Sequence, residues 1–524
     1  MVRNIKQIKI ENLLGWASMA LLLFLTFGTL VIILLKSHNN FQFTSMDFKV
    51  IKFTLYQAFV STLISSILGI FLARALIRQS FWGKSLLITI LGAPFILPTV
   101  VAILGIISIF GRNGFLNNIL EPLGFKTLSI YGLHGIIIAN IFFNLPLVSR
   151  LILQGWQNIP TEQFRLAESL NFSRKNLFFL IELPMLKSRI PGIFAVVFLI
   201  CISSFSIALT LGGGPKSTTI ELAIYQAFRF DFDLGKAANL AIFQFIFCLL
   251  LTIIVLWKQK NEPFQVAYDR TIQRWDINKK SFIDWTIICV SSVFLMAPLL
   301  TVIIDGASAI QFLNIVILIS LIKSIFVAVG SVVICLSITF FIGNVVASNH
   351  TSSKVKWFME GTGYFVIATS PLVIGTGLFI FLYPLLDPTR FVLPITALVN
   401  AIMALPFSLR IILPNLQKIN QDYSKLSESL GLKGLDKFFK LTVPRLRKEI
   451  GFAGGLIGAM SMGDLGIVTL FSSPDSGTLP LIIYRLMGSY QMEAAKAAAL
   501  ILLITCFAIF LLADRLGKSN ARSE

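Results

Sequence analysis

Apolar residues dominate this chain and fall into blocks of about 20 residues, separated by short polar stretches. A block of that length, wound as a helix, crosses the roughly 30 Å hydrocarbon core of a bilayer. A membrane barrel would instead alternate polar and apolar residues with a period of two. The pattern predicts an all-α integral membrane protein of about 12 transmembrane helices, near 14–35, 55–77, 86–110, 133–155, 190–211, 238–257, 284–304, 323–347, 361–384, 391–413, 451–471 and 496–514.

Composition supports this class, because 56% of the residues are hydrophobic and only 13% are charged, against about 25% charged in soluble domains. The first block follows Arg3, Lys6 and Lys9, as a signal-peptide core would. The block is longer than the hydrophobic region of an ordinary signal peptide, and no A-x-A-like cleavage site follows it. We therefore expect 14–35 to be a retained first span.

The formal net charge of +19 raises the question of a nucleic-acid partner. With the N-terminus inside, about 32 Lys and Arg fall in cytoplasmic segments and about 12 in external ones, as the positive-inside rule requires. The richest loop is 414–450. This placement accounts for the basic balance without nucleic acid. An even number of spans puts both termini in the cytoplasm.

Metal and catalytic chemistry have little support in the sequence. The three histidines are scattered, and the five cysteines lie inside apolar blocks without C-x-x-C spacing. Cysteines in such places are small buried hydrophobes. No nucleophile–base set is visible. We therefore expect no catalytic residue, no metal site and no enzyme activity on this chain.

One polar segment occurs twice. AESLNFSRKNLFFLIELPML at 167–186 aligns without gaps with SESLGLKGLDKFFKLTVPRL at 427–446, and the match resumes at 218–226 and 477–485. About six blocks separate equivalent points, so both copies have the same orientation in two parallel six-helix halves. We divide the chain into a first half (1–260, polar loop near 157–189), a cytoplasmic connecting loop (261–283) and a second half (284–524, polar loop near 414–450).

Each copy has helical periodicity on both sides of a residue that tolerates positive φ, Asn171 or Gly431. A left-handed residue there would end one short helix and direct the next. Pro184 or Pro444 then begins the return to the membrane. A solvated loop with i,i+3 ion pairs is the simpler interpretation, but the repetition at constant spacing favours a docking element for two identical or similar cytoplasmic subunits.

These segments resemble the EAA-x3-G-x9-I-x-L-P loop of permease subunits in bacterial binding-protein-dependent ABC importers. The spacing to the proline matches in both copies. The first glutamate of the pattern does not, because Arg165 and Lys425 stand there and the acids come three residues later. The residues that the resemblance assigns to ATPase coupling are Ala167, Glu168, Asn171, Ile181, Pro184, Ser427, Glu428, Gly431, Leu441 and Pro444.

Four further stretches are similar to the fused double-length permeases of the ferric-iron and thiamine type, most closely to thiamine transporter permeases. They are LPTVVAILGIISIFGRNGFL (97–116), YGLHGIIIANIFFNLPLVSRLILQ (131–154), LGGGPKSTTIELAIYQA (211–227) and SMGDLGIVTLF (461–471). The resemblance implies a type I ABC importer permease in the bacterial inner membrane. It also implies import of thiamine or its phosphates from periplasm to cytoplasm.

The same resemblance implies the partners: two copies of an ABC ATPase on the cytoplasmic loops, a periplasmic thiamine-binding protein outside, and lipid. ATP would be used by the partner, since the chain has no G-x-x-x-x-G-K-[ST] loop. We therefore expect no cofactor on this chain. ATP-driven closure would push the two loops together and switch the spans from inward-facing to outward-facing.

Polar residues inside predicted spans are candidates for the substrate path. An acid within a span is costly and often functional, and a cationic aromatic substrate such as thiamine favours carboxylates or aromatic faces. The alternative roles are structural, as hydrogen bonds between helices. The candidates are Asp464, Asn140, Asn144 and Asn400.

Two other functions stay open. A ferric-iron importer would use acids and tyrosines near the outer mouth. An ion-coupled secondary transporter would need ionisable relays near the membrane centre, where only Asp464 and, at a span end, Asp305 stand. Requirement for a separate ATPase discriminates between an importer and a secondary transporter. The residues available for iron are Tyr225, Tyr484, Glu221, Asp231 and Asp233.

Overall fold

The computed structural model describes residues 2–36, 43–84, 87–88, 91, 96–258, 281–348, 351–366, 369–432, 434–472 and 477–518. Within these ranges every regular element is a helix. Eleven helical stretches are long and apolar enough to cross a membrane, and two apolar helices are shorter. The predicted all-α membrane class is confirmed.

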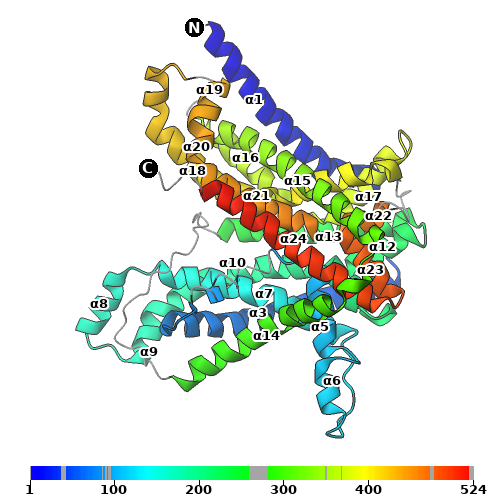
Figure 1. Ribbon diagram of the computed structural model, residues 1–524. Helices are drawn as coiled ribbons and strands as arrows, with labels where there is room; N and C mark the ends of the chain where they lie inside the picture. The colour runs from blue at the N-terminus through cyan, green and yellow to red at the C-terminus, as the bar shows by residue number, and fades with distance from the viewer. Residues whose placement is uncertain are drawn as a thin grey trace.

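Figure 1 labels the helices in chain order, and they are grouped here by the two predicted halves. The first half contains α1 (Val2–Leu23), η1 (Phe24–Gly28), α2 (Thr29–Lys36), α3 (Ser45–Arg78), α5 (Thr99–Phe110), α6 (Phe115–Leu120), α7 (Leu133–Gln157), α8 (Thr161–Ser169), α9 (Arg174–Leu177), η3 (Phe178–Glu182), α10 (Leu183–Ile202), α11 (Phe205–Leu211), η4 (Pro215–Ser217), α12 (Ile220–Arg229) and α13 (Leu234–Lys258). The second half contains α14 (Phe282–Ser308), η5 (Ile310–Phe312), α15 (Ile315–Ala347), α16 (Ser353–Phe365), α17 (Pro371–Leu382), η7 (Pro388–Phe391), α18 (Val392–Ser429), α19 (Gly434–Lys437), η8 (Phe438–Thr442), α20 (Val443–Arg445), α21 (Arg447–Met462), α22 (Gly466–Phe471), α23 (Leu479–Gly488) and α24 (Met492–Lys518).

Four predicted spans differ from the structure. The blocks 190–211 and 451–471 are each broken, the first between α10 and α11 and the second between α21 and α22. The block 361–384 is divided between the end of α16 and α17, because Pro371 begins a new helix that the Ser370 hydroxyl caps. In the block 86–110, α5 begins only at Thr99, and part of 86–98 lies outside the described residues. The connecting loop 261–283 also lies almost entirely outside them.

The two halves share matched packing. In the first half the Thr54 hydroxyl of α3 accepts a hydrogen bond from the Ile220 amide at 2.9 Å, which opens α12. In the second half the Ser324 hydroxyl of α15 accepts one from the Leu479 amide at 2.8 Å, which opens α23. The two hydroxyls satisfy orphan N–H groups of the two short helices in the same way.

The first span of each half packs on the opposite half. Helices α1 and α2 contact α15 and α17, whereas α14 contacts α3 and α5. At Gly15 a side chain would overlap Val345 of α15, and at Gly377 it would overlap Thr29 of α2. The close approach therefore depends on glycine, and the halves are interlocked.

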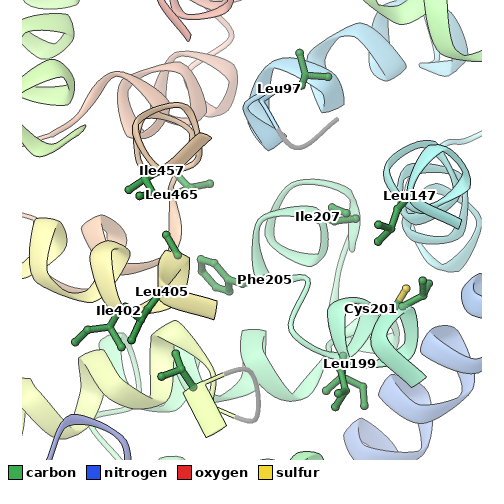
Figure 2. Close-up of a cluster of buried hydrophobic side chains, with 14 of the residues drawn as sticks. Leu97, Leu147, Leu199, Cys201, Phe205, Ile207, Ile402, Leu405, Ile457 and Leu465 are labelled. Atoms are coloured by element: carbon green, nitrogen blue, oxygen red, sulfur yellow. The ribbon is translucent and has the colours of Figure 1, made fainter. Parts of the chain in front are cut away.

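Both repeated segments lie at one end of the molecule, and they are separated from each other there (Figure 1). Helix α1 begins and α24 ends at this same end, while α12, α22 and α23 lie at the other. The apolar core extends across the boundary between the halves. Figure 2 shows Phe205 of α11 pointing toward Leu405 of α18.

Candidate coupling segments and substrate path

We call 157–189 the first coupling segment and 414–450 the second. Each contains the predicted left-handed residue, with φ of 51° at Asn171 and 64° at Gly431. In the first segment the Asn171 amide donates to the Glu168 carbonyl at 3.0 Å, and the Phe172 amide donates to the Ala167 carbonyl at 2.9 Å. This pair of bonds is a Schellman motif.

The second coupling segment closes its helix with the same two bonds. The Gly431 amide donates to the Glu428 carbonyl at 3.1 Å, and the Leu432 amide donates to the Ser427 carbonyl at 2.9 Å. Small residues lie under both turns, since Ala167 is 1% exposed and Ser427 4% exposed. The predicted helix–turn–helix geometry is confirmed in both copies.

Matched side chains point outward from the two turns. Glu168 and Glu428 are both exposed. Large apolar side chains beside them are exposed too, and the surfaces of soluble proteins seldom present such groups of apolar residues. Because the same positions are exposed twice, each segment offers the same mixed acidic and apolar surface. The matched apolar residues are Leu166, Leu170 and Phe179 in the first segment and Leu426, Leu430 and Phe439 in the second.

Both segments return to the membrane through a π-helical turn, η3 in the first and η8 in the second. Pro184 and Pro444 follow these turns by two residues. Proline removes one N–H donor and crowds the preceding turn, and a π turn widens the helix there. The residues Ile181 and Leu441 of the sequence pattern lie within these turns and are partly buried.

The attachment of the two segments differs. In the first, α7 ends at Gln157 and Pro160 precedes α8, whose Phe164 packs inward. In the second, α18 continues through the matched position, Asn420. The Lys437 ammonium donates to the Asn420 side-chain oxygen at 3.1 Å. The side-chain NH₂ of Asn420 donates to the Ala347 carbonyl of α15 at 3.5 Å.

The first two asparagine candidates hold helices together. Asn140 of α7 donates to the Gln57 side chain of α3 at 3.1 Å, and Gln57 donates to the Cys201 carbonyl of α10 at 3.0 Å. Asn144 donates to the Asn140 carbonyl at 2.8 Å and to the Cys201 sulfur at 3.3 Å. The sequence did not single out Gln57, although it is a lone amide in an apolar block.

Asn400 occupies the matched place in the second half. It donates to the Ser461 hydroxyl of α21 at 3.1 Å, and that hydroxyl shares a 2.8 Å hydrogen bond with Ser331 of α15. All three asparagines are buried. Their contacts fit the structural alternative, in which polar side chains join neighbouring helices.

Asp464 lies in a break between α21 and α22. Its Oδ1 accepts the Gly466 amide at 3.1 Å, whereas its Oδ2 is buried and has no hydrogen-bond partner among the described residues. The backbone N–H of Ile467 and the side-chain amide of Asn400 also lie close enough to interact with this carboxyl, although the Asn400 amide makes its 3.1 Å hydrogen bond to Ser461. Asp464 is therefore the candidate whose hydrogen bonding is left incomplete by the fold.

The end of the molecule that bears α12, α22 and α23 carries contacts that the sequence did not indicate. Arg229 of the first half donates to the Ser472 carbonyl of the second half at 3.2 Å. Arg485 donates to the Ser472 hydroxyl, also at 3.2 Å. The ring of Phe228 packs edge-on against Phe379 of α17 at 5.0 Å. The two halves are thus joined at this end.

The residues considered for iron are dispersed. Glu221 is buried and accepts a 2.7 Å hydrogen bond from Gln244. Asp231 and Asp233 are exposed, and Tyr225 and Tyr484 are half-buried. Across the described part of the chain, no group of three His, Cys, Asp or Glu is arranged to hold a metal ion.

Comparison with known proteins assigns the family. The family of the binding-protein-dependent transport system inner membrane component matches residues 65–260 and 339–522, one match in each half. The thiamine transport system permease protein ThiP of Escherichia coli is 36% identical over 488 residues, covering 91% of this chain and 90% of that protein. The protein of the same name from Salmonella typhimurium is 34% identical, with 91% and 90% covered. The one from Brucella abortus is 34% identical over 520 residues, with 97% and 95% covered. This chain therefore belongs to the family of binding-protein-dependent transport system inner membrane components.

Proposed function

We propose that the chain is the membrane-spanning permease of an ABC importer that moves thiamine or its phosphates from the periplasm to the cytoplasm. The observation that carries this proposal is similarity over about nine-tenths of both chains to proteins named as thiamine permeases. The energy comes from ATP hydrolysis on a separate ATPase subunit. This chain itself binds no ATP and has no enzyme activity.

Two copies of the ATPase bind, one on each coupling segment. The matched turns and the matched exposed side chains support two equivalent docking sites. The segments lie apart at one end of the molecule. Closure of two ATPases around ATP would draw them together, and the interlocked halves would respond as one bistable unit.

The end that bears the coupling segments faces the cytoplasm, so both termini are cytoplasmic. A periplasmic thiamine-binding protein delivers substrate to the opposite end, where α12, α22 and α23 lie. The Arg229–Ser472 contact and the Phe228–Phe379 contact join the halves there. The joined outer end and the separated coupling segments support the assignment of this conformation to an inward-facing state.

Uptake of labelled thiamine tests the proposal. Cells that lack their own thiamine transporter would express this chain with its cognate ATPase and binding protein, and the control would carry an ATPase unable to hydrolyse ATP. We expect uptake only with the active ATPase. Uptake of ferric iron instead of thiamine would overturn the substrate but keep the mechanism. Thiamine uptake with the inactive ATPase would overturn the importer.

A further inference from the structure

Each half contains a membrane helix that breaks at the same place. Helix α10 ends at Ile202 before α11, and α21 ends at Met462 before α22. Ser204 and Asp464 hold matched positions within the two breaks. Irregular backbone inside a membrane protein is tolerated where it is buried in protein or lines a path for solutes.

The second break lies at the boundary between the halves, close to Phe205, which follows the first break. A side chain added at Gly463 would lie 2.9 Å from the Cα of Pro98 in the first half. One added at Gly466 would lie 3.8 Å from the ring of Phe205. Figure 2 shows this ring directed from α11 toward Leu405 of the second half. The residues that follow the two breaks, Phe205 and Gly466, therefore lie close together where the two halves meet.

Only one break carries a charge. The Ser204 hydroxyl donates to the Cys201 carbonyl at the end of α10 at 2.8 Å and is satisfied there. In the other break, Asp464 Oδ2 is shielded from solvent and has no partner with full hydrogen-bond geometry among the described residues, although the Ile467 backbone N–H and the Asn400 side chain lie near the carboxyl. A buried carboxylate oxygen without a donor is costly. A cation at this boundary would remove that cost.

An aromatic face accompanies the carboxylate. Phe205 is almost fully buried and packs edge-on against the half-buried Tyr225 at 5.4 Å between ring centres. Aromatic rings favour both cations and other aromatic rings. One acid from the second half and one ring from the first thus flank the same boundary.

We propose that the boundary between the two breaks is a transient subsite for an aromatic monocation, whose charge is taken up by Asp464 and whose ring contacts Phe205. The inference rests on the proposed function, because thiamine combines a thiazolium cation with a pyrimidine ring. Substrate would occupy this subsite during the switch between inward-facing and outward-facing states.

A purely structural role for Asp464 makes a different prediction. As a cap, the carboxylate serves the Gly466 amide and is tied to α22. If Asp464 instead supplies the negative charge for a ligand between the halves, an aspartate at the matched position 204 should supply that charge equally well. The exchange variant S204D/D464S therefore separates the two roles, and S204A is the control at the neutral break.

The experiment uses the complete complex of this chain, ATPase and binding protein in lipid vesicles. It measures labelled thiamine imported and ATP hydrolysed under binding-protein stimulation. For D464N we expect at least about a tenfold fall in thiamine imported per ATP, with hydrolysis within about threefold of wild type. S204A should behave as wild type, and S204D/D464S should recover most of the loss seen in D464S.

Unchanged import per ATP in D464N would overturn the subsite. Equal loss of import and hydrolysis in D464N, or an exchange variant no better than D464S, would assign Asp464 a structural role and also overturn it. Failure of the proposed function gives a different result, because the wild-type complex itself would then import no thiamine.

Discussion

The two coupling segments have the same turn but are joined to the membrane helices differently. In the first, the Asn171 turn belongs to a short helix that Pro160 separates from α7. In the second, the Gly431 turn ends a 38-residue helix that also forms a candidate membrane span. Proline lacks an N–H donor and restricts the residue before it, which favours a separation of α7 from α8 at Pro160, whereas the prolines inside α7 and α18 are accommodated within those helices. Asn420 imposes no such restriction.

The anchors follow the same division. The first segment buries the apolar side chains of Phe164 and Leu177, next to the buried Trp156 of α7, and it also buries Glu182. The second is held at the matched place by the polar chain from Lys437 through Asn420 to the Ala347 carbonyl. The repeat therefore specifies the shape offered to a partner, while each half supports that shape in its own way. We expect motion of the second segment to reach α18 more directly.

The largest effect should come from breaking the continuous helix. Asn420→Pro removes an interior N–H and both Asn420 side-chain bonds, at a cost of about 3 kcal/mol or more. We expect loss of uptake and a lower thermal midpoint of unfolding. The reciprocal Pro160→Asn, which gives the first segment the residue of the second, should retain most uptake. Normal uptake in Asn420→Pro would show that continuity of α18 is not required.

Substitution of the left-handed residues should have the next largest effect. Asn171→Val and Gly431→Val each place a β-branched residue at positive φ, at a cost of about 1–2 kcal/mol. We expect impaired uptake and weaker ATPase association, measured together. The exchange variants Asn171→Gly and Gly431→Asn are matched controls and should transport normally. Full activity in both valine variants would contradict the role of the turn.

Charge reversal on the exposed faces should have a moderate effect. Glu168 and Glu428 are the matched acids beside the turns. Reversing both to lysine should reduce copurification of the ATPase, and the reduction should shrink at high salt, because exposed charges are screened. Reversal of Asp387, an exposed acid outside both segments, is the control. Undiminished copurification would leave the two glutamates as solvated surface residues.

The smallest effect should come from exchanging the anchor. Lys437→Leu gives the second segment the residue that the first has at Leu177. It removes one hydrogen bond to Asn420, worth about 1 kcal/mol. We expect a slightly lower thermal midpoint and nearly normal uptake. A large loss of uptake would mean that the polar chain, and not the turn, controls coupling.

The sequence predicted those features that depend on local residue types. Asn171 and Gly431 indicated the left-handed turns, and block lengths indicated the membrane class. It did not predict that α1 and α14 cross to the opposite half, because hydropathy contains no information about which helices pack together. The π turns before Pro184 and Pro444 were also missed, since a proline predicts a disturbed helix but not how it is accommodated.

Side-chain roles in the interior were the least predictable. Asn140 and Asn400 stood out as polar residues in apolar blocks, but their partners Gln57 and Ser461 are remote in sequence. The inter-half contact of Arg229 with Ser472 could not be inferred for the same reason. Of the four substrate-path candidates, all within the described part of the chain, Asp464 alone has a buried side-chain oxygen without a hydrogen-bond partner.

The most direct test of the central claim measures the distance between the two coupling segments. Spin labels would be attached at Ser169→Cys and Ser429→Cys, which are matched exposed positions, with the exposed Cys289 replaced by serine. Distances from electron–electron double resonance would be compared in the complete complex without nucleotide and with ATP bound to a hydrolysis-deficient ATPase. The account predicts a shorter distance with ATP. An unchanged or longer distance would contradict it.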